Sequence, residues 1–135
     1  MIKTVNLKKI YQTDEIETTA LNGVNIDIKE GEFVSVMGPS GCGKTTLLNI
    51  LAGFLAPTSG SVSLGKKDIR GPGQDRGMVF QQGALFEWLS VEKNVGFGPR
   101  MNGKPAAETK TKVDRLLQTV GLAGFGSKAV YELSG

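Results

Sequence analysis

The stretch that decides the fold reads Gly38-Pro39-Ser40-Gly41-Cys42-Gly43-Lys44-Thr45. It fits the pattern G-x-x-x-x-G-K-[ST]. In such a loop the glycines let the backbone wrap closely around an anion, and successive N–H groups point into one concavity. Lys44 supplies a mobile ammonium, and Thr45 supplies a hydroxyl oxygen of the kind that Mg²⁺ prefers. The stretch therefore predicts a phosphate-binding loop. The alternative is a glycine-rich turn that only joins a strand to a helix.

The segments on either side of this loop favour the first interpretation. Residues 33–37 form a short apolar run rich in β-forming residues, which predicts a buried strand. Residues 44–52 are mostly apolar and predict a helix that ends at Gly53. A strand before the loop and a helix after it are the context that a phosphate loop requires. The loop alone indicates a nucleoside triphosphate and does not distinguish kinases, GTPases and ATPases.

Hydrophobic patterning predicts further elements. Alternating apolar and polar residues predict strands at 4–8, 24–28 and 61–64, and a short buried strand is expected at 77–80. Residues 11–18 are polar and acidic, which predicts a loop.

Toward the end of the chain the pattern becomes helical. Val113, Leu116, Leu117 and Val120 recur at helical spacing and predict one apolar helix face. Pro105 stands where this helix could begin, and Gly121 stands where it would end.

Composition excludes several kinds of protein. The 135 residues include 16 Lys and Arg, 13 Asp and Glu, one Cys and no His. A single cysteine excludes an internal disulfide, and the lack of His excludes zinc fingers and Ser-His-Asp triads. The net charge of +3 is small, and the Lys and Arg residues are scattered along the chain, so no nucleic-acid partner is expected. Without an apolar run of membrane-spanning length or a signal-peptide pattern, a cytosolic location is expected.

Other short motifs follow one another in a fixed order. They are Ile10-Tyr11, residues 20–24, residues 30–33, Leu51-Ala52-Gly53, residues 57–60, residues 77–82 and Glu132-Leu133-Ser134-Gly135. With these motifs the chain resembles the ATP-binding subunit of an ABC transporter, over residues 3–135. Residues 71–77, together with Trp88, are most similar to importers of nitrate, sulfonates, taurine or bicarbonate.

The resemblance implies an α/β fold. This would be a P-loop NTPase (RecA-like) core with an N-terminal antiparallel β portion and the start of an α-helical subdomain. Residues 1–89 would form the N-terminal part of the ATP-binding core, with the phosphate loop and the Q-loop. Residues 90–135 would form the helical subdomain and end in a partial signature motif. The domain is expected to be incomplete, because the sequence stops inside that motif.

The resemblance also implies a role for each matching residue, with ATP and Mg²⁺ as cofactors. Tyr11 would stack on adenine, and its alternative is a tyrosine that covers the core. Gln81 and Lys44 would take part in catalysis, and Thr45 and Gln81 would hold Mg²⁺. Gln81 as an ordinary solvated turn residue is the alternative. The residues implied to bind the nucleotide are Tyr11, Gly38, Pro39, Ser40, Gly41, Cys42, Gly43, Lys44, Thr45, Thr46, Ser134 and Gly135.

The implied function is ATP binding and hydrolysis coupled to solute transport, from the cytoplasmic side of the membrane. Residues 84–89 would contact transmembrane permease subunits, although Trp88 could instead belong to the core. Full-length subunits would form a head-to-tail homodimer. The chain alone is expected not to turn over ATP, because the motifs that would follow Gly135 are missing. The alternatives are a non-catalytic ATP- or phosphate-binding fragment, an ABC-superfamily ATPase without a transport role, and a small-molecule kinase.

Overall fold

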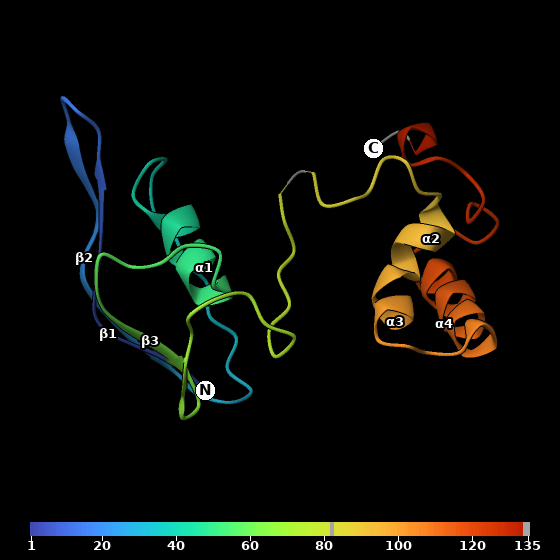
Figure 1. Cartoon of the computed structure of the whole chain (residues 1–135), viewed down its shortest axis with the longest axis horizontal. Coiled ribbons are helices and arrows are strands. Elements are labelled where there is room, and N and C mark those ends of the chain that lie inside the picture. Colours follow the sequence, from blue (N-terminus) through green and yellow to red (C-terminus); the bar gives the residue numbers. More distant parts are fainter. Residues whose placement is uncertain (82, 134–135) are drawn as a thin grey trace. The chain divides into compact units, whose positions relative to one another are not determined.

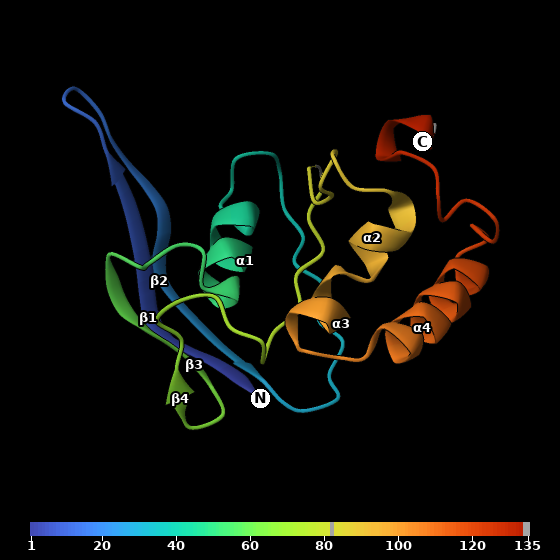
Figure 2. The same cartoon turned by 45° about the vertical axis from the view of Figure 1, so that its right-hand side comes forward.

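The chain forms two compact units, Met1–Met78 and Val79–Gly135. The structure is a computed structural model that describes residues 1–81 and 83–133. Figure 1 and Figure 2 show the strands and one helix in the first unit and the remaining helices in the second. Each unit has its own apolar core, so each is described by itself.

The first unit is built on an antiparallel sheet. Strands β1 (Ile2–Gln12) and β2 (Glu17–Ile28) form a long hairpin, and β3 (Ser59–Leu64) pairs with the other edge of β1. The short β4 (Lys67–Asp68) completes the order β2-β1-β3-β4 (Figure 2). The predicted loop at 11–18 is wrong in extent, because both strands continue into it and leave only residues 13–16 as the turn.

A bulge in β1 decides which of its side chains enter the core. The pairing register with β2 shifts between Thr4 and Leu7, and Asn6 between them adopts a φ of 47°. Asparagine tolerates this left-handed conformation better than most residues. As a result Thr4 and Leu7 are buried, at 2% and 0% exposure, whereas Val5 is 42% exposed. The predicted strand is present, but simple alternation fails across the bulge.

Helix α1 (Lys44–Ala52) covers the sheet and has the predicted bounds. Its Leu47 and Ile50 are buried against the strands. The helix ends at Gly53, whose N–H donates to the carbonyl oxygens of Asn49 and Ile50. The core of this unit consists of Leu7, Leu21, Leu47, Ile50, Val62 and Ile69.

Two predicted buried strands are wrong. Residues 33–37 and 77–80 have no strand structure, and Phe33 and Val79 are 96% and 97% exposed. A strand needs hydrogen-bonding partners along its backbone. No strand within residues 1–81 and 83–133 pairs with either segment. Apolar composition therefore identifies segments suited to burial. Such a segment becomes a strand only where a neighbouring strand forms hydrogen bonds with its backbone.

The second unit is helical. It contains α2 (Val91–Val95), α3 (Phe97–Met101), α4 (Ala106–Thr119) and the 3₁₀ turn η1 (Val130–Glu132). Its core brings Val91 of α2 against Val113 and Leu117 of α4. The loop after α4 returns to α2, where the N–H of Val91 donates to the carbonyl oxygen of Lys128.

The apolar face of α4 is narrower than predicted. Val113 and Leu117 are buried, but Leu116 and Val120 are 42% and 65% exposed. Thr109 takes the third buried position, one turn before Val113. None of the helices in the described ranges is long and apolar enough to cross a membrane.

Candidate functional site

The predicted phosphate loop lies directly before α1. Residues 38–43 leave the helix N-terminus open, and no side chain caps it. Gly43 is the N-cap residue and adopts a left-handed conformation, with φ 94°. A Cβ at this position would lie 2.5 Å from the carbonyl oxygen of Ala20 in β2. Only glycine therefore lets the loop approach the sheet so closely. The free N–H groups and the helix dipole make this end of α1 attractive to anions.

Lys44 reaches back over the loop. Its ammonium donates hydrogen bonds to the carbonyl oxygens of Gly38, at 2.8 Å, and Pro39, at 2.6 Å. It also lies 3.6 Å from the sulfur of Cys42, which is an exposed free thiol. The positive charge thus sits over the loop rather than out in solvent. Because its partners are neutral carbonyls, a phosphate oxygen would be a stronger acceptor in the same place.

Tyr11 lies beside the start of α1, although 35 residues separate it from Thr46. The hydroxyl oxygens of Tyr11 and Thr46 are 3.3 Å apart. Tyr11 is 42% exposed, so much of its ring remains accessible. Thr45, the second residue of α1, is also exposed. The structure therefore brings Tyr11, Lys44, Thr45 and Thr46 to one end of α1.

Other residues of the predicted site are not joined to this group by the structure. Gln81 is exposed and belongs to the second unit, so its partnership with Thr45 at Mg²⁺ stays a prediction. Ser134 and Gly135 lie outside the described residues. Ser40 and Gly41 are exposed in the loop.

The hydroxyl of Thr45 is a group of the kind that suits a hard metal ion such as Mg²⁺. No group of three or more Cys, Asp or Glu residues that could hold a metal ion occurs in residues 1–81 and 83–133. The exposed Thr45 hydroxyl can supply one hard oxygen ligand beside a phosphate loop. Mg²⁺ commonly keeps several waters and binds substrate phosphates with few protein ligands.

The segment predicted to meet a membrane partner is held to α2 by one side chain. Asn94 accepts a hydrogen bond from the N–H of Phe86, at 2.8 Å, and donates to three carbonyl oxygens, those of Phe86, Leu89 and Ser90. Phe86 packs between Trp88 and Phe97, with ring centroids 5.3 Å and 4.6 Å away. Trp88 itself is 79% exposed, so it does not belong to the core of this unit.

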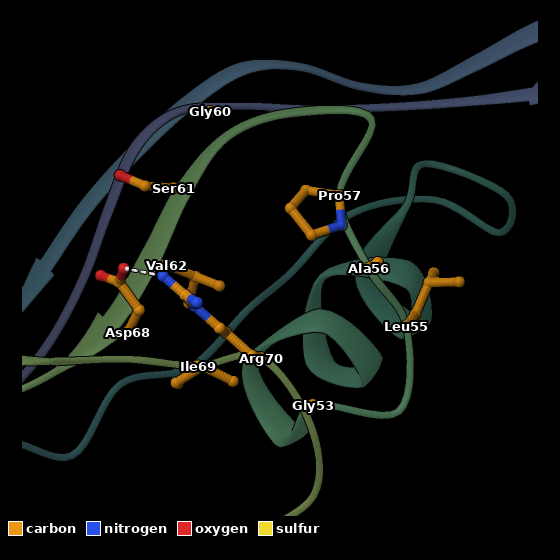
Figure 3. A pocket seen from close by; sticks show the side chains of 10 residues that line it. All are labelled: Gly53, Leu55, Ala56, Pro57, Gly60, Ser61, Val62, Asp68, Ile69 and Arg70. Carbon is orange, nitrogen blue, oxygen red and sulfur yellow. Dashed lines mark ion pairs between the residues drawn. The ribbon is translucent and has the colours of Figure 1, made fainter.

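A separate pocket lies at the other end of α1. Its volume is about 310 Å³, and Leu55, Pro57, Val62 and Ile69 supply its apolar lining (Figure 3). Asp68 and Arg70 form an ion pair of 3.6 Å at this pocket, but both side chains are mostly exposed. Such a pair contributes little to stability. None of the site residues predicted from the sequence lines this pocket.

Two structurally important residues were not predicted from the sequence, Lys9 in the first unit and Asn94 in the second. The ammonium of Lys9 lies 5.4 Å from the centroid of the Tyr11 ring. Its position two residues before Tyr11 on a strand was an available signal, because such residues share a face. Asn94 gave no comparable signal, since its partners are loop carbonyls that only the fold brings within reach.

Comparisons with known proteins identify the class. The family described as ABC transporter matches residues 21–135, and the chain belongs to it. A solved structure of the ATP-binding cassette MJ0796, a dimer in a post-hydrolysis state bound to ADP and Pi, matches with a TM-score of 0.87 and 33% identity. That match covers 99% of this chain and 63% of the other. The expected fold class is confirmed: an α/β P-loop NTPase core with an antiparallel β portion and the start of a helical subdomain.

Individual relatives point to importers. The taurine import ATP-binding protein TauB of Jannaschia sp. (strain CCS1) is 62% identical over 116 residues, which are 86% of this chain and 43% of the relative. TauB of Pelagibacter ubique is 57% identical over 131 residues, which are 96% of this chain and 49% of the relative. The chain therefore spans about half the length of these curated relatives. The predicted similarity to ATP-binding subunits of the nitrate and taurine importers is confirmed.

Proposed function

We propose that this chain is the nucleotide-binding front part of the ATP-binding subunit of an ABC importer. The observation that carries the proposal is the end of α1, where the helix N-terminus is uncapped, the Lys44 ammonium lies on a loop carbonyl and Thr45 is exposed. These groups suit a polyphosphate bound with Mg²⁺. Tyr11, fixed beside Thr46, suits the base of a nucleotide.

In this proposal each residue of the loop has a distinct task. The N–H groups of residues 40–45 hold phosphate oxygens, and Lys44 exchanges the carbonyls of Gly38 and Pro39 for the outer phosphates. Thr45 offers its hydroxyl to Mg²⁺, which when bound neutralises phosphate charge. The resemblance to the family implies that Gln81 would also hold Mg²⁺ and would orient the attacking water. Cys42 and Thr46 contact the nucleotide, Cys42 through its backbone and Thr46 through its side chain.

The whole subunit would couple ATP hydrolysis to solute import, and a small sulfonate such as taurine is the proposed solute. The names of the TauB relatives support this choice. The proposed position is peripheral, on the cytoplasmic face of the membrane. The exposed aromatic segment at 84–89 would meet the permease, and Trp88 supplies its largest accessible apolar surface. Two subunits would pair head to tail, and Ser134 and Gly135 would complete the partner's nucleotide site.

We further propose that residues 1–89 belong to the ATP-binding core and residues 90–135 to the helical subdomain. ATP turnover by this chain alone is expected to be negligible. Phosphoryl transfer depends on positioning and charge neutralisation by several groups that act together. Steady hydrolysis by the purified chain that Lys44→Ala abolishes would contradict this expectation.

A crystal structure with Mg²⁺ and a non-hydrolysable ATP analogue tests the proposal. The expected result is phosphates against the N–H groups of residues 40–45, with the Lys44 ammonium moved from the Gly38 carbonyl to the outer phosphates. The base should lie against the Tyr11 ring. Nucleotide bound elsewhere, with residues 38–45 unchanged, would overturn the proposal.

A further inference from the structure

Lys9 contacts two parts of the first unit at once. Its ammonium donates a hydrogen bond of 2.9 Å to the carbonyl oxygen of Ala56, in the segment between α1 and β3. The same ammonium lies 5.4 Å from the centroid of the Tyr11 ring. At this distance a cation over an aromatic face is attracted by the electron-rich π system. Lys9 thus ties the ring of Tyr11 to the segment that follows α1.

The backbone around Tyr11 is held to the same segment. The hydroxyl of Thr58 accepts a hydrogen bond of 3.0 Å from the N–H of Ile10. The N–H of Thr58 donates a hydrogen bond of 2.8 Å to the carbonyl oxygen of Lys8. The part of β1 that carries Lys9 is therefore hydrogen-bonded to the segment before β3. Its ammonium and the backbone of β1 are both anchored by residues 56–58, which leaves the ammonium little freedom to leave the Tyr11 ring.

Tyr11 is consequently restrained from two directions. Thr46 holds its hydroxyl at 3.3 Å, which fixes the edge of the ring against α1. Lys9 lies over one face of the ring, and Tyr11 as a whole is 42% exposed, so part of the side chain stays accessible to a planar ligand. A flat base can stack on an aromatic ring only where no other group already lies.

From this arrangement we infer that Lys9 is a positioning residue for nucleotide binding. It orients the Tyr11 ring and leaves a single face for the purine base, and this rests on the proposed function. Pre-organising a binding group lowers the entropy lost when the ligand binds. Lys9 thereby selects for a ligand that carries a base, and it contributes nothing to a bare polyphosphate.

The test compares two ligands, Mg-ATP and Mg-tripolyphosphate, by isothermal titration calorimetry. Lys9→Met keeps the aliphatic stem and removes the charge. We expect it to raise the Kd for Mg-ATP by about two- to fivefold and to leave the Kd for Mg-tripolyphosphate unchanged. Lys9→Arg, which preserves a cation over the ring, should restore most of the affinity for Mg-ATP. Lys8→Met makes the same charge change one residue away and should alter neither Kd.

Three outcomes would overturn the inference. If Lys9→Met weakens both ligands equally, Lys9 acts as a general cation toward phosphate. If it changes neither Kd, the ring does not depend on Lys9. If Lys9→Arg fails to restore Mg-ATP affinity while thermal unfolding shows an intact fold, the cation over the ring is not the cause. Failure of the proposed function looks different, because the wild-type chain would then bind neither ligand.

Discussion

The hydroxyl oxygens of Tyr11 and Thr46 lie 3.3 Å apart, and this contact joins the end of β1 to the first turn of α1. It places an aromatic ring beside the loop that precedes the helix. Leu7 of β1 and Ile50 of α1 also belong to the same apolar core. The ring and the loop are therefore parts of one packed unit. The base and the phosphates of one nucleotide can therefore be bound by groups whose spacing the fold has already set.

The Tyr11 ring, more than its hydroxyl, should contribute to nucleotide affinity. Tyr11→Ala removes the stacking surface, and stacking of a base on an aromatic side chain is worth about 1–3 kcal/mol. We expect Mg-ATP affinity to fall by about 5- to 150-fold, measured by calorimetry. Tyr11→Phe keeps the ring and loses only the contact with Thr46, so a loss below about fivefold is expected. Equal losses in both variants would show that the hydroxyl is the important group.

Gly43 should be intolerant of any side chain. Gly43→Ala requires a left-handed backbone and places a Cβ 2.5 Å from the carbonyl oxygen of Ala20. Gly65→Ala is the matched control, because Gly65 also has a positive φ, 60°, but nothing lies within 4 Å of its Cβ position. By urea unfolding, Gly43→Ala should lose about 1–3 kcal/mol more than Gly65→Ala. Similar losses in the two variants would mean that the loop can move away from β2.

Asn94 should stabilise the loop that carries Trp88. Asn94→Ala removes four hydrogen bonds to residues 86–90. We expect a loss of about 1–3 kcal/mol in the unfolding free energy of the second unit, followed by fluorescence of Trp88, the single tryptophan. Asn102→Ala is the control, because Asn102 is an exposed residue at the end of α3. A loss no larger than that of the control would show that the loop is held by its aromatic contacts alone.

Glu132 should titrate below its ordinary range. The N–H of Ala129 donates to its carboxylate at 2.7 Å and, with the Lys128 ammonium at 3.3 Å, lowers the pKa of Glu132 below the ordinary value of 4.5. A lowered pKa in the folded state means that the charged group stabilises η1 at pH values above 4.5. This contribution is lost as the pH falls through the folded-state pKa.

An NMR titration of the Glu132 side chain tests the sign of this effect. Its pKa should lie below 4.5 in the wild type and rise in Lys128→Met, while the distant Lys112→Met should leave it unchanged. A wild-type pKa at or above 4.5 would mean that the Ala129 N–H does not hold the carboxylate in solution.

Local features of the sequence predicted local structure well. The loop at 38–45 and the helix that begins at Lys44 follow from neighbouring residues: glycines before the helix, apolar residues within it and Gly53 at its end. The strand predicted at 24–28 follows from alternation in β2, where Val24, Ile26 and Ile28 are half-buried and the residues between them are exposed.

Features that depend on distant partners were not predictable. The apolar runs at 33–37 and 77–80 would need neighbouring strands to form strands themselves. Val5 is exposed because Asn6 starts a bulge, which depends on the register with β2. At the site, residue types located the loop, but they gave no indication that the Lys44 ammonium would lie on the Gly38 carbonyl.

The most direct measurement is a calorimetric titration of Mg-ATP into the wild-type chain and Lys44→Ala, with Lys66→Ala, in the exposed turn between β3 and β4, as the charge-matched control. The ammonium–phosphate contact is charge-assisted, so Lys44→Ala should weaken binding by about tenfold or more, and Lys66→Ala should match the wild type. Equal affinities for wild type and Lys44→Ala would contradict the claim that the loop at 38–45 holds the polyphosphate.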